Sequence, residues 1–257
     1  KHFMTNRPNG VNITIIGVGS NLLIRDGGVS GIVIRLGESF SNIDVEGEFI
    51  KCGAAAIDAK IATVAQKHGI GGLEFISGIP GTIGGLVAMN GGTHLGESSD
   101  RVLEVRSFDF SKPGEPIRVR RGGELSFSYR KNSFLSPHEI VIDSLWKLER
   151  GDPSTIREKL DTLYRRRKET QPLDFPSCGS VFKNPRDSGL RAWEVVEKLG
   201  LRGHRIGNAR ISEKHPNWIL NLGGARANDV IALIELVKSR AKRELGITMV
   251  EEVRILP

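Results

Sequence analysis

Glycine is concentrated in two segments where an exposed backbone could bind an anionic cofactor. The first is Gly17-Val18-Gly19-Ser20-Asn21, and the second is Gly78-Ile79-Pro80-Gly81-Thr82-Ile83-Gly84-Gly85, followed by Ala88-Met89-Asn90-Gly91-Gly92. Glycine is costly in backbone entropy, but it lets the main chain approach a ligand closely. Amide groups exposed in such a loop can bind a diphosphate or the edge of a flavin ring. The density of glycine in the second segment favours this function over a purely structural one.

The first glycine segment is a weaker signal, which a plain tight turn would also explain. It follows a strand-like run directly and does not open a helix. A Rossmann fingerprint needs a helix N-terminus to receive the pyrophosphate, so this is not one. A nest of amide groups with Ser20 and Asn21 as extra donors is the alternative use.

Several polar residues are ordinary when taken singly. Arg130, which follows a tyrosine, would ordinarily be a surface charge, and Gly179-Ser180 would ordinarily be a turn. Glu252 and Arg254, two residues apart on a strand, would ordinarily form a weak surface ion pair. Ser180 does not lie in the G-x-S-x-G elbow of hydrolases. The histidines show no metal-ligand pairing, so we expect no metal site.

Five sequence motifs that occur in a fixed order suggest that these residues belong to one functional site. After the two glycine segments come Phe127-Ser128-Tyr129-Arg130-Lys131-Asn132-Ser133-Phe134, then Gly179-Ser180-Val181-Phe182-Lys183-Asn184-Pro185, and finally Glu251-Glu252-Val253-Arg254. From about residue 13 to its end, the chain resembles the UDP-N-acetylenolpyruvoylglucosamine reductases. The stretch from Ile211-Ser212-Glu213-Lys214-His215 through Asn221 is similar to the subgroup that lacks an inserted tyrosine loop over the substrate.

The resemblance implies a flavoenzyme of peptidoglycan synthesis. NADPH would reduce FAD, leave, and be replaced by a UDP-sugar whose enolpyruvyl group takes hydride from flavin N5. The product would be UDP-N-acetylmuramate. We also expect no membrane insertion, no nucleic-acid partner and a monomer.

The resemblance also implies a catalytic trio of Arg130, Ser180 and Glu252. Hydride addition to the terminal methylene carbon develops negative charge on the enolpyruvyl carboxylate. A fixed guanidinium such as Arg130 would stabilise that charge. Glu252, its pKa raised by burial beside the carboxylate, would be protonated or share a hydrogen bond. Ser180 would deliver a proton to the carbanionic carbon.

Other residues are expected to bind the cofactor or the substrate. Those expected to contact FAD are Gly17, Gly19, Ser20, Asn21, Gly53, Gly78, Ile79, Pro80, Gly81, Ile83, Gly84, Gly85, Ala88, Asn90, Gly92 and Ile140. Those expected to contact the UDP-sugar are Tyr129, Lys183, Asn184 and His215. The basic run Arg165-Arg166-Arg167-Lys168 is a second candidate for its diphosphate, with a solvated helix face as the alternative.

The chain departs from the family pattern at its start. Family members carry a threonine and paired glycines, which help to hold FAD, before the first glycine segment, and only sixteen residues precede Gly17 here. We therefore expect the first flavin lobe to lack its N-terminal part.

Composition limits the class of protein without choosing one. Hydrophobic residues make up 39% and charged residues 26% of the 257, and no apolar run approaches a membrane span. Two cysteines favour a reducing compartment, so we expect a cytoplasmic protein. The net charge of +7 favours anionic partners and leaves a nucleic-acid-binding module as an alternative, although only 6% of residues are aromatic. A flavin-dependent oxidase of the same fold is the other alternative.

The hydrophobic pattern predicts the elements that must position these residues. Amphipathic spacing predicts a helix over Ala56–His68 that ends at Gly69, a helix after Asp152-Pro153, a helix over Ala192–Leu199, and a helix that Asn228 caps and Gly246 ends. Apolar runs predict the strands Ile13–Ile16, Ile32–Leu36, Phe49–Cys52, Val102–Phe108, Ile117–Val119, Ile140–Leu148 and Thr248–Leu256. On the last strand, Val250, Glu252 and Arg254 are expected to share a face.

Together these features predict an α+β protein. We expect a two-lobed FAD-binding domain like that of vanillyl-alcohol oxidase, with a smaller α+β substrate-binding domain. The expected division is residues 1–36 with 251–257 for the first flavin lobe, 37–170 for the second, and 171–250 for the substrate domain.

Overall fold

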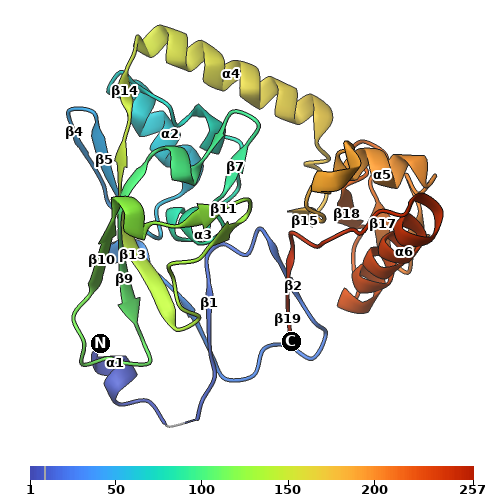
Figure 1. Cartoon of the computed structure of the whole chain (residues 1–257), viewed down its shortest axis with the longest axis horizontal. Helices are drawn as coiled ribbons and strands as arrows, with labels where there is room; N and C mark the ends of the chain where they lie inside the picture. Colours follow the sequence, from blue (N-terminus) through green and yellow to red (C-terminus); the bar gives the residue numbers. More distant parts are fainter. Residues whose placement is uncertain (9) are drawn as a thin grey trace. The chain divides into compact units, whose positions relative to one another are not determined.

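A computed structural model describes residues 1–8 and 10–257 and divides the chain into two compact units (Figure 1). The first unit comprises Lys1–Val18 and Gly31–Arg166, and the second comprises Gly19–Ser30 and Arg167–Pro257. Each unit has its own hydrophobic core. The first glycine segment is thus divided, since Gly17 lies in the first unit and Gly19 to Asn21 lie in the second.

A five-stranded antiparallel sheet in the order β10-β9-β13-β5-β4 organises the first unit. Alternating apolar residues of β5 and β13, such as Ile50 and Trp146, are fully buried against α2 residues such as Ile61. The elements of this unit are α1 (His2–Thr5), β1 (Ile13–Ile16), β3 (Ile32–Arg35), β4 (Ile43–Glu46), β5 (Phe49–Gly53), α2 (Asp58–Lys67), β6 (Ile70–Gly71), α3 (Ile83–Ala88), β7 (Gly92–Thr93), β8 (Gly96–Glu97), β9 (Val102–Asp109), β10 (Arg118–Arg121), β11 (Phe127–Ser128), β12 (Lys131–Asn132), β13 (Glu139–Lys147), β14 (Glu149–Arg150) and α4 (Pro153–Thr170), whose last residues belong to the second unit.

A four-stranded antiparallel sheet in the order β15-β18-β17-β16 organises the second unit. Its residues Ile211 and Ile219 pack into one cluster with Val195 of α5 and Leu233 of α6. The last residues of the chain pair in parallel with residues after the first glycine segment. The elements are β2 (Leu22–Ile24), β15 (Ser177–Ser180), α5 (Ala192–Lys198), β16 (Arg205–Ile206), β17 (Ala209–Ile211), β18 (Trp218–Asn221), α6 (Ala227–Leu245) and β19 (Arg254–Leu256).

Most of the strongly periodic elements lie where the sequence predicts them, and the last strand and the start of α6 are among the details that differ. The final strand is regular only over Arg254–Leu256, because upstream of it the backbone makes a single bridge, between Phe182 and Glu251. The expected shared face of Val250, Glu252 and Arg254 therefore does not rest on a continuous strand. Helix α6 begins at Ala227 rather than after a cap at Asn228, because the carboxylate of distant Asp26 accepts hydrogen bonds from both backbone amides, at 2.8 and 3.3 Å.

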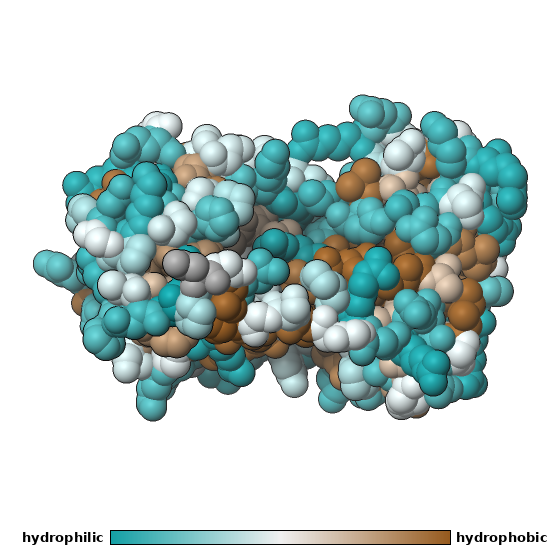
Figure 2. Space-filling view, turned by 90° about the horizontal axis from the view of Figure 1, so that it is seen from below, coloured by the Kyte–Doolittle hydropathy of each residue, from teal (hydrophilic) through white to brown (hydrophobic). Residues whose placement is uncertain are grey.

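The surface in Figure 2 is mostly hydrophilic, with smaller hydrophobic areas between the polar residues. Among the described residues, no helix combines the length and the apolar character that crossing a membrane requires.

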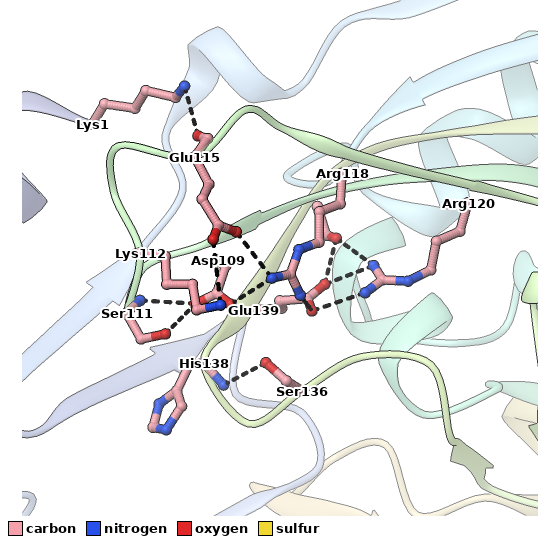
Figure 3. Close-up of polar contacts among 11 residues, drawn as sticks. Lys1, Asp109, Ser111, Lys112, Glu115, Arg118, Arg120, Ser136, His138 and Glu139 are labelled. Atoms are coloured by element: carbon pink, nitrogen blue, oxygen red, sulfur yellow. Dashed lines mark hydrogen bonds and ion pairs between the residues drawn. The ribbon is translucent and has the colours of Figure 1, made fainter.

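A buried ion network ties β9, β10 and β13 together (Figure 3). The Glu139 side chain is fully buried and accepts hydrogen bonds from Arg118, Arg120 and Ser107 at 2.6–2.9 Å. Burial alone would raise the pKa of Glu139. The hydrogen bonds from Arg120 and Ser107 and the charges of both arginines outweigh burial, so the pKa of Glu139 lies below its ordinary value.

We expect Glu139→Gln to destabilise the first unit by about 2 kcal/mol near neutral pH, because a charged acceptor of several hydrogen bonds becomes neutral. A lowered pKa means that the stabilisation exists above the ordinary glutamate pKa and is lost as pH falls through the folded-state pKa. The difference between the wild type and the variant in urea unfolding should therefore shrink in acid. Glu149→Gln, which removes the exposed partner of Arg101, is the matched control and should leave urea unfolding unchanged. An equal effect of both substitutions would contradict this account.

Candidate active site

The second glycine segment is held in place by the residues that lead from β5 into α2. The amides of Ile83 and Gly84 donate to the carbonyls of Ala56 and Ala54, at 3.0 and 2.8 Å, and the amide of Asp58 donates to the carbonyl of Gly81 at 3.2 Å. Helix α2 begins at Asp58, two residues later than the sequence predicts, because the carbonyls of Ala54 and Ala56 accept from the loop and Ile57 is the N-cap. These bonds also fix the start of α3, a short helix that was not predicted from the sequence.

Several amides of this loop are already used within the chain. Those of Ile83 and Gly84 are bonded as described above, and those of Ile79 and Gly81 donate to the carbonyls of Ile76 and Ile79. Each of these four amides therefore has an acceptor within its own chain. Gly85 is different. It is exposed, and the nearest atom to a Cβ placed there would be 3.9 Å away.

Close packing within the protein explains other glycines of the predicted cofactor set. A Cβ at Gly53 would lie 2.1 Å from the carbonyl oxygen of Phe40, and one at Gly92 would lie 2.5 Å from that of Gly96. A Cβ at Gly17 would lie 2.9 Å from Oγ1 of Thr82, which brings the first glycine segment against the second within the first unit. Ile140 lies in a hydrophobic cluster with Phe108 and Phe110.

Asp58, which is not among the predicted site residues, is a buried acid beneath the loop. Its side chain is fully buried, and neither carboxyl oxygen has a hydrogen-bond partner. A Cβ at Gly81 would lie 2.5 Å from Oδ2 of Asp58. Burial raises the pKa of Asp58 well above the ordinary aspartate value. As the first residue of an ordinary amphipathic helix, Asp58 gave no sign in the sequence that the loop would cover it.

The predicted catalytic arginine lies in a hairpin bound to this loop. Tyr129 and Arg130 form the two-residue turn between β11 and β12. Arg130 has a φ of 55°, a backbone conformation that is strained for a residue other than glycine. Its guanidinium lies 5.0 Å from the centroid of the Tyr129 ring and donates to the carbonyl of Gly92 at 2.7 Å.

Asn90 links the hairpin to the loop. It is fully buried, has a φ of 44°, donates to the carbonyl of Ser128 at 3.1 Å and accepts from the amide of Ser99 at 2.9 Å. Asn132 of the hairpin donates to the carbonyl of Ala88 at 2.6 Å. The structure thus brings Arg130 and Tyr129 together with the predicted cofactor residues Ala88, Asn90 and Gly92.

The second unit brings together Ser180, Glu252 and the rest of the first glycine segment. The backbone amide of Glu252 donates at 2.8 Å to the carbonyl of Val181, the residue after Ser180. The side chain of Asn21 donates to the carbonyl of Glu252 at 3.1 Å, and a Cβ at Gly179 would lie 3.8 Å from the carbonyl oxygen of Ser20. Both Ser180 and Glu252 are half-buried.

The predicted substrate residues of the second unit differ in their surroundings. The amide of Lys183 donates to the carbonyl of Val250 at 2.9 Å, which sets Lys183 beside the segment of Glu252. Oδ1 of exposed Asn184 accepts from the amide of Ala192, so this side chain also caps α5. His215 is half-buried, and burial and the charge of Arg202 lower its pKa.

The residues present fit a flavin. Each unit has a glycine whose backbone a planar ligand could approach. In the second unit it is Gly19, with a φ of 78° and no atom within 4 Å of a Cβ position, and in the first it is exposed Gly85. Arg130 supplies a fixed positive charge beside the loop. These are features of a protein that binds a dinucleotide cofactor through glycine loops.

Comparison with known proteins first defines the class. A family model described as an FAD binding domain matches residues 5–119, which include both glycine segments. The protein is therefore an FAD-dependent oxidoreductase, and the expected fold class and FAD cofactor are confirmed.

The second match defines the family. A model described as the C-terminal domain of UDP-N-acetylenolpyruvoylglucosamine reductase matches residues 171–256. The enzyme of that name from Rhodospirillum rubrum is 40% identical over 98% of this chain and 79% of its own length, and that from Halalkalibacterium halodurans is 39% identical over 94% and 79%. The crystal structure of the Thermus caldophilus reductase superposes with a TM-score of 0.83, at 36% identity, over 97% of this chain and 87% of its own. The chain belongs to the UDP-N-acetylenolpyruvoylglucosamine reductase family, as predicted.

The packing of Gly81 generates a test of the loop. Gly81→Ala should lower the amount of flavin that copurifies with the protein, because the new methyl group would overlap the Asp58 carboxyl and displace the loop. Gly85→Ala adds the same methyl group in open space and should retain flavin, as judged by visible absorption. Adding Asp58→Ala to Gly81→Ala removes the overlapping oxygens and should restore part of the flavin. Equal flavin loss in both single variants would show that the overlap is not the cause.

Proposed function

We propose that this chain reduces the enolpyruvyl group of UDP-N-acetylglucosamine enolpyruvate to give UDP-N-acetylmuramate in peptidoglycan synthesis. The observation that carries the proposal is the contact between Arg130 and Gly92, because it sets a permanent charge beside a loop in the FAD-binding region. FAD, when bound, would supply the hydride, after its own reduction by NADPH.

Arg130 has the chemistry to stabilise the developing charge. The hydrogen bond to Gly92 and the Tyr129 ring restrict its guanidinium, so little reorganisation is needed when negative charge develops on the substrate carboxylate. A strained backbone at this position supports a functional reason for the conformation. Tyr129, beside it, would contact the substrate.

Ser180 and Glu252 would complete the reaction from the second unit. Ser180 would donate a proton to the carbon that bears the carboxylate, and Glu252 in its neutral form would donate a hydrogen bond to that carboxylate. The backbone bond between Glu252 and Val181 supports this pairing, because it fixes the two segments to one another. Lys183, Asn184 and His215 would bind the nucleotide sugar.

Three further expectations belong to the proposal. The protein would act in the cytoplasm, where its nucleotide-sugar substrate is made, and it would act as a monomer. Residues 1–36 with 251–257 and residues 37–170 would form the flavin lobes, and residues 171–250 would form the substrate domain.

Ser180→Ala tests the proton donor in separate half-reactions. Reduction of bound flavin by NADPH should proceed at the wild-type rate. Reoxidation by the enolpyruvyl sugar should slow by at least about a hundredfold, because the general acid is absent. Stopped-flow absorbance of the flavin measures both rates. Ser188→Ala, on the same unit, is the matched control. Loss of both half-reactions in Ser180→Ala would contradict a specific role in protonation.

Arg130→Lys separates charge from geometry. It keeps the positive charge but loses the planar fork, so it should lower kcat more than it weakens substrate binding. Arg130→Ala should raise the barrier of reoxidation by about 3 kcal/mol, the usual size for one preorganised group. If Arg130→Ala changed only KM, the residue would bind the ground state alone and its role in the transition state would be wrong.

A further inference from the structure

The segment just before β19 carries Glu252, which would donate a hydrogen bond to the substrate carboxylate. This segment is not a regular strand, because its pairing with the chain after β15 is an isolated bridge between Phe182 and Glu251. The amide of Glu252 donates to the carbonyl of Val181 at 2.8 Å as part of this short pairing. A bridge of one residue pair holds the backbone less firmly than a long ladder of hydrogen bonds. Side-chain contacts therefore have more weight in fixing the position of Glu252.

The side chain of Glu251 makes such a contact with α6. Nζ of Lys238 lies 2.7 Å from Oε1 of Glu251 and 3.0 Å from Oε1 of Glu235. Glu251 is also the more buried of the two partners, since its side chain is 26% exposed and that of Glu235 is 60% exposed. Ion pairs of well-exposed side chains contribute little, because water and salt screen them. The pair between Lys238 and Glu251 is therefore the stronger of the two.

Both members of this pair are charged near neutral pH. The hydrogen bonds to Glu251 and Glu235 raise the pKa of Lys238 above its ordinary value. Burial alone would raise the pKa of Glu251. The hydrogen bonds from Lys238 and from the Glu251 amide, with the charge of Lys238, outweigh burial and lower that pKa. The contact is thus a charge-assisted hydrogen bond, which is stronger than a neutral one.

The two sides of the bridge are attached to well-packed parts of the second unit. Val237, which precedes Lys238 on α6, is fully buried in the core of this unit. The buried side chain of Asn217 is bonded to both backbone groups of Phe182, at 3.0 and 2.9 Å. The helix holds one strand of the bridge through Lys238, and Asn217 holds the other. Because the residue before it is fixed, the backbone from which the Glu252 side chain starts is fixed as well.

We propose that Lys238 is a positioning residue for Glu252 and acts through its ion pair with Glu251. This inference rests on the proposed function and adds to it a residue of α6 that lies outside the predicted catalytic trio. A displacement of about 1 Å in a reacting geometry can slow a reaction by about a hundredfold. A partial loosening of the segment should therefore be visible in the rate.

Stopped-flow absorbance of the flavin in the holoenzyme tests this role. Lys238→Met removes the charge, and it should slow reoxidation by saturating enolpyruvyl sugar by about tenfold, because Glu252 is no longer held in place. Reduction by NADPH should keep its wild-type rate, and KM for the sugar should change much less than kcat. Lys238→Arg keeps the charge and should restore most of the rate. Arg240→Met, which removes a similarly exposed cation paired with Glu244 on the same helix, should leave both half-reactions unchanged.

A double variant shows whether Lys238 acts through Glu252. In Glu252→Ala the segment has no catalytic side chain to position, so the addition of Lys238→Met should cause no further slowing. Glu251→Gln removes the charge of the other partner and should slow reoxidation in the same selective way. It provides an independent test if Lys238→Met does not fold, which near-ultraviolet circular dichroism would show.

The outcomes separate the positioning role from the proposed function. Wild-type reoxidation in both Lys238→Met and Glu251→Gln would overturn the positioning role and leave the proposed function standing. Equal slowing of the two half-reactions would also overturn it, as would full additivity of Lys238→Met with Glu252→Ala, since each indicates a general effect on the fold. A wild-type holoenzyme whose reduced flavin is not reoxidised by the enolpyruvyl sugar would overturn the proposed function, and the positioning role with it.

Discussion

The two hydrogen bonds made by the buried side-chain amide of Asn90 are the interactions on which the candidate site depends most. One side chain binds both the hairpin of β11 and β12 and the backbone at Ser99, from a strained position at the end of the glycine-rich stretch. A buried amide left without these partners would be costly, so the three segments must fold together. Through this arrangement the charge of Arg130 becomes fixed beside the loop and does not move freely in solvent.

In the glycine-rich loop, the same residue type occurs for two different physical reasons. Glycine was expected there because a ligand approaches the backbone. At Gly53, Gly81 and Gly92 the approaching atoms belong to the protein itself. Gly81 and Gly92 of the loop, and Gly53 at the end of β5, pack closely against other parts of the chain. Exposed Gly85 instead lies where a cofactor could contact the backbone. Both uses require the absence of a Cβ, so the sequence cannot distinguish them.

Two kinds of buried polar group occur in this protein, and they have different consequences. Glu139 is surrounded by its partners and holds its charge within the sheet of the first unit. Asp58, Arg210, His215 and Trp218 each bury a polar atom that has no hydrogen-bond partner among the residues that the structure describes. Unpaired groups of this kind are costly to stability, and they are therefore better guides to function than the ion network is.

The sequence by itself determined the class of fold, most of the long elements and the family. The helices with a continuous apolar face, α2, α4 and α6, and the long strands β9 and β13 were predicted, because their periodicity is a local property of the chain. The motifs around Arg130, Ser180 and Glu252 were recognised for the same reason. Only the tertiary structure decided that Asp26 caps α6, that Asp58 lies beneath Gly81, and that Arg210 and Trp218 share a face with Ser180. Each of these depends on residues far apart in the chain, and the pairing of distant segments leaves no trace in local spacing.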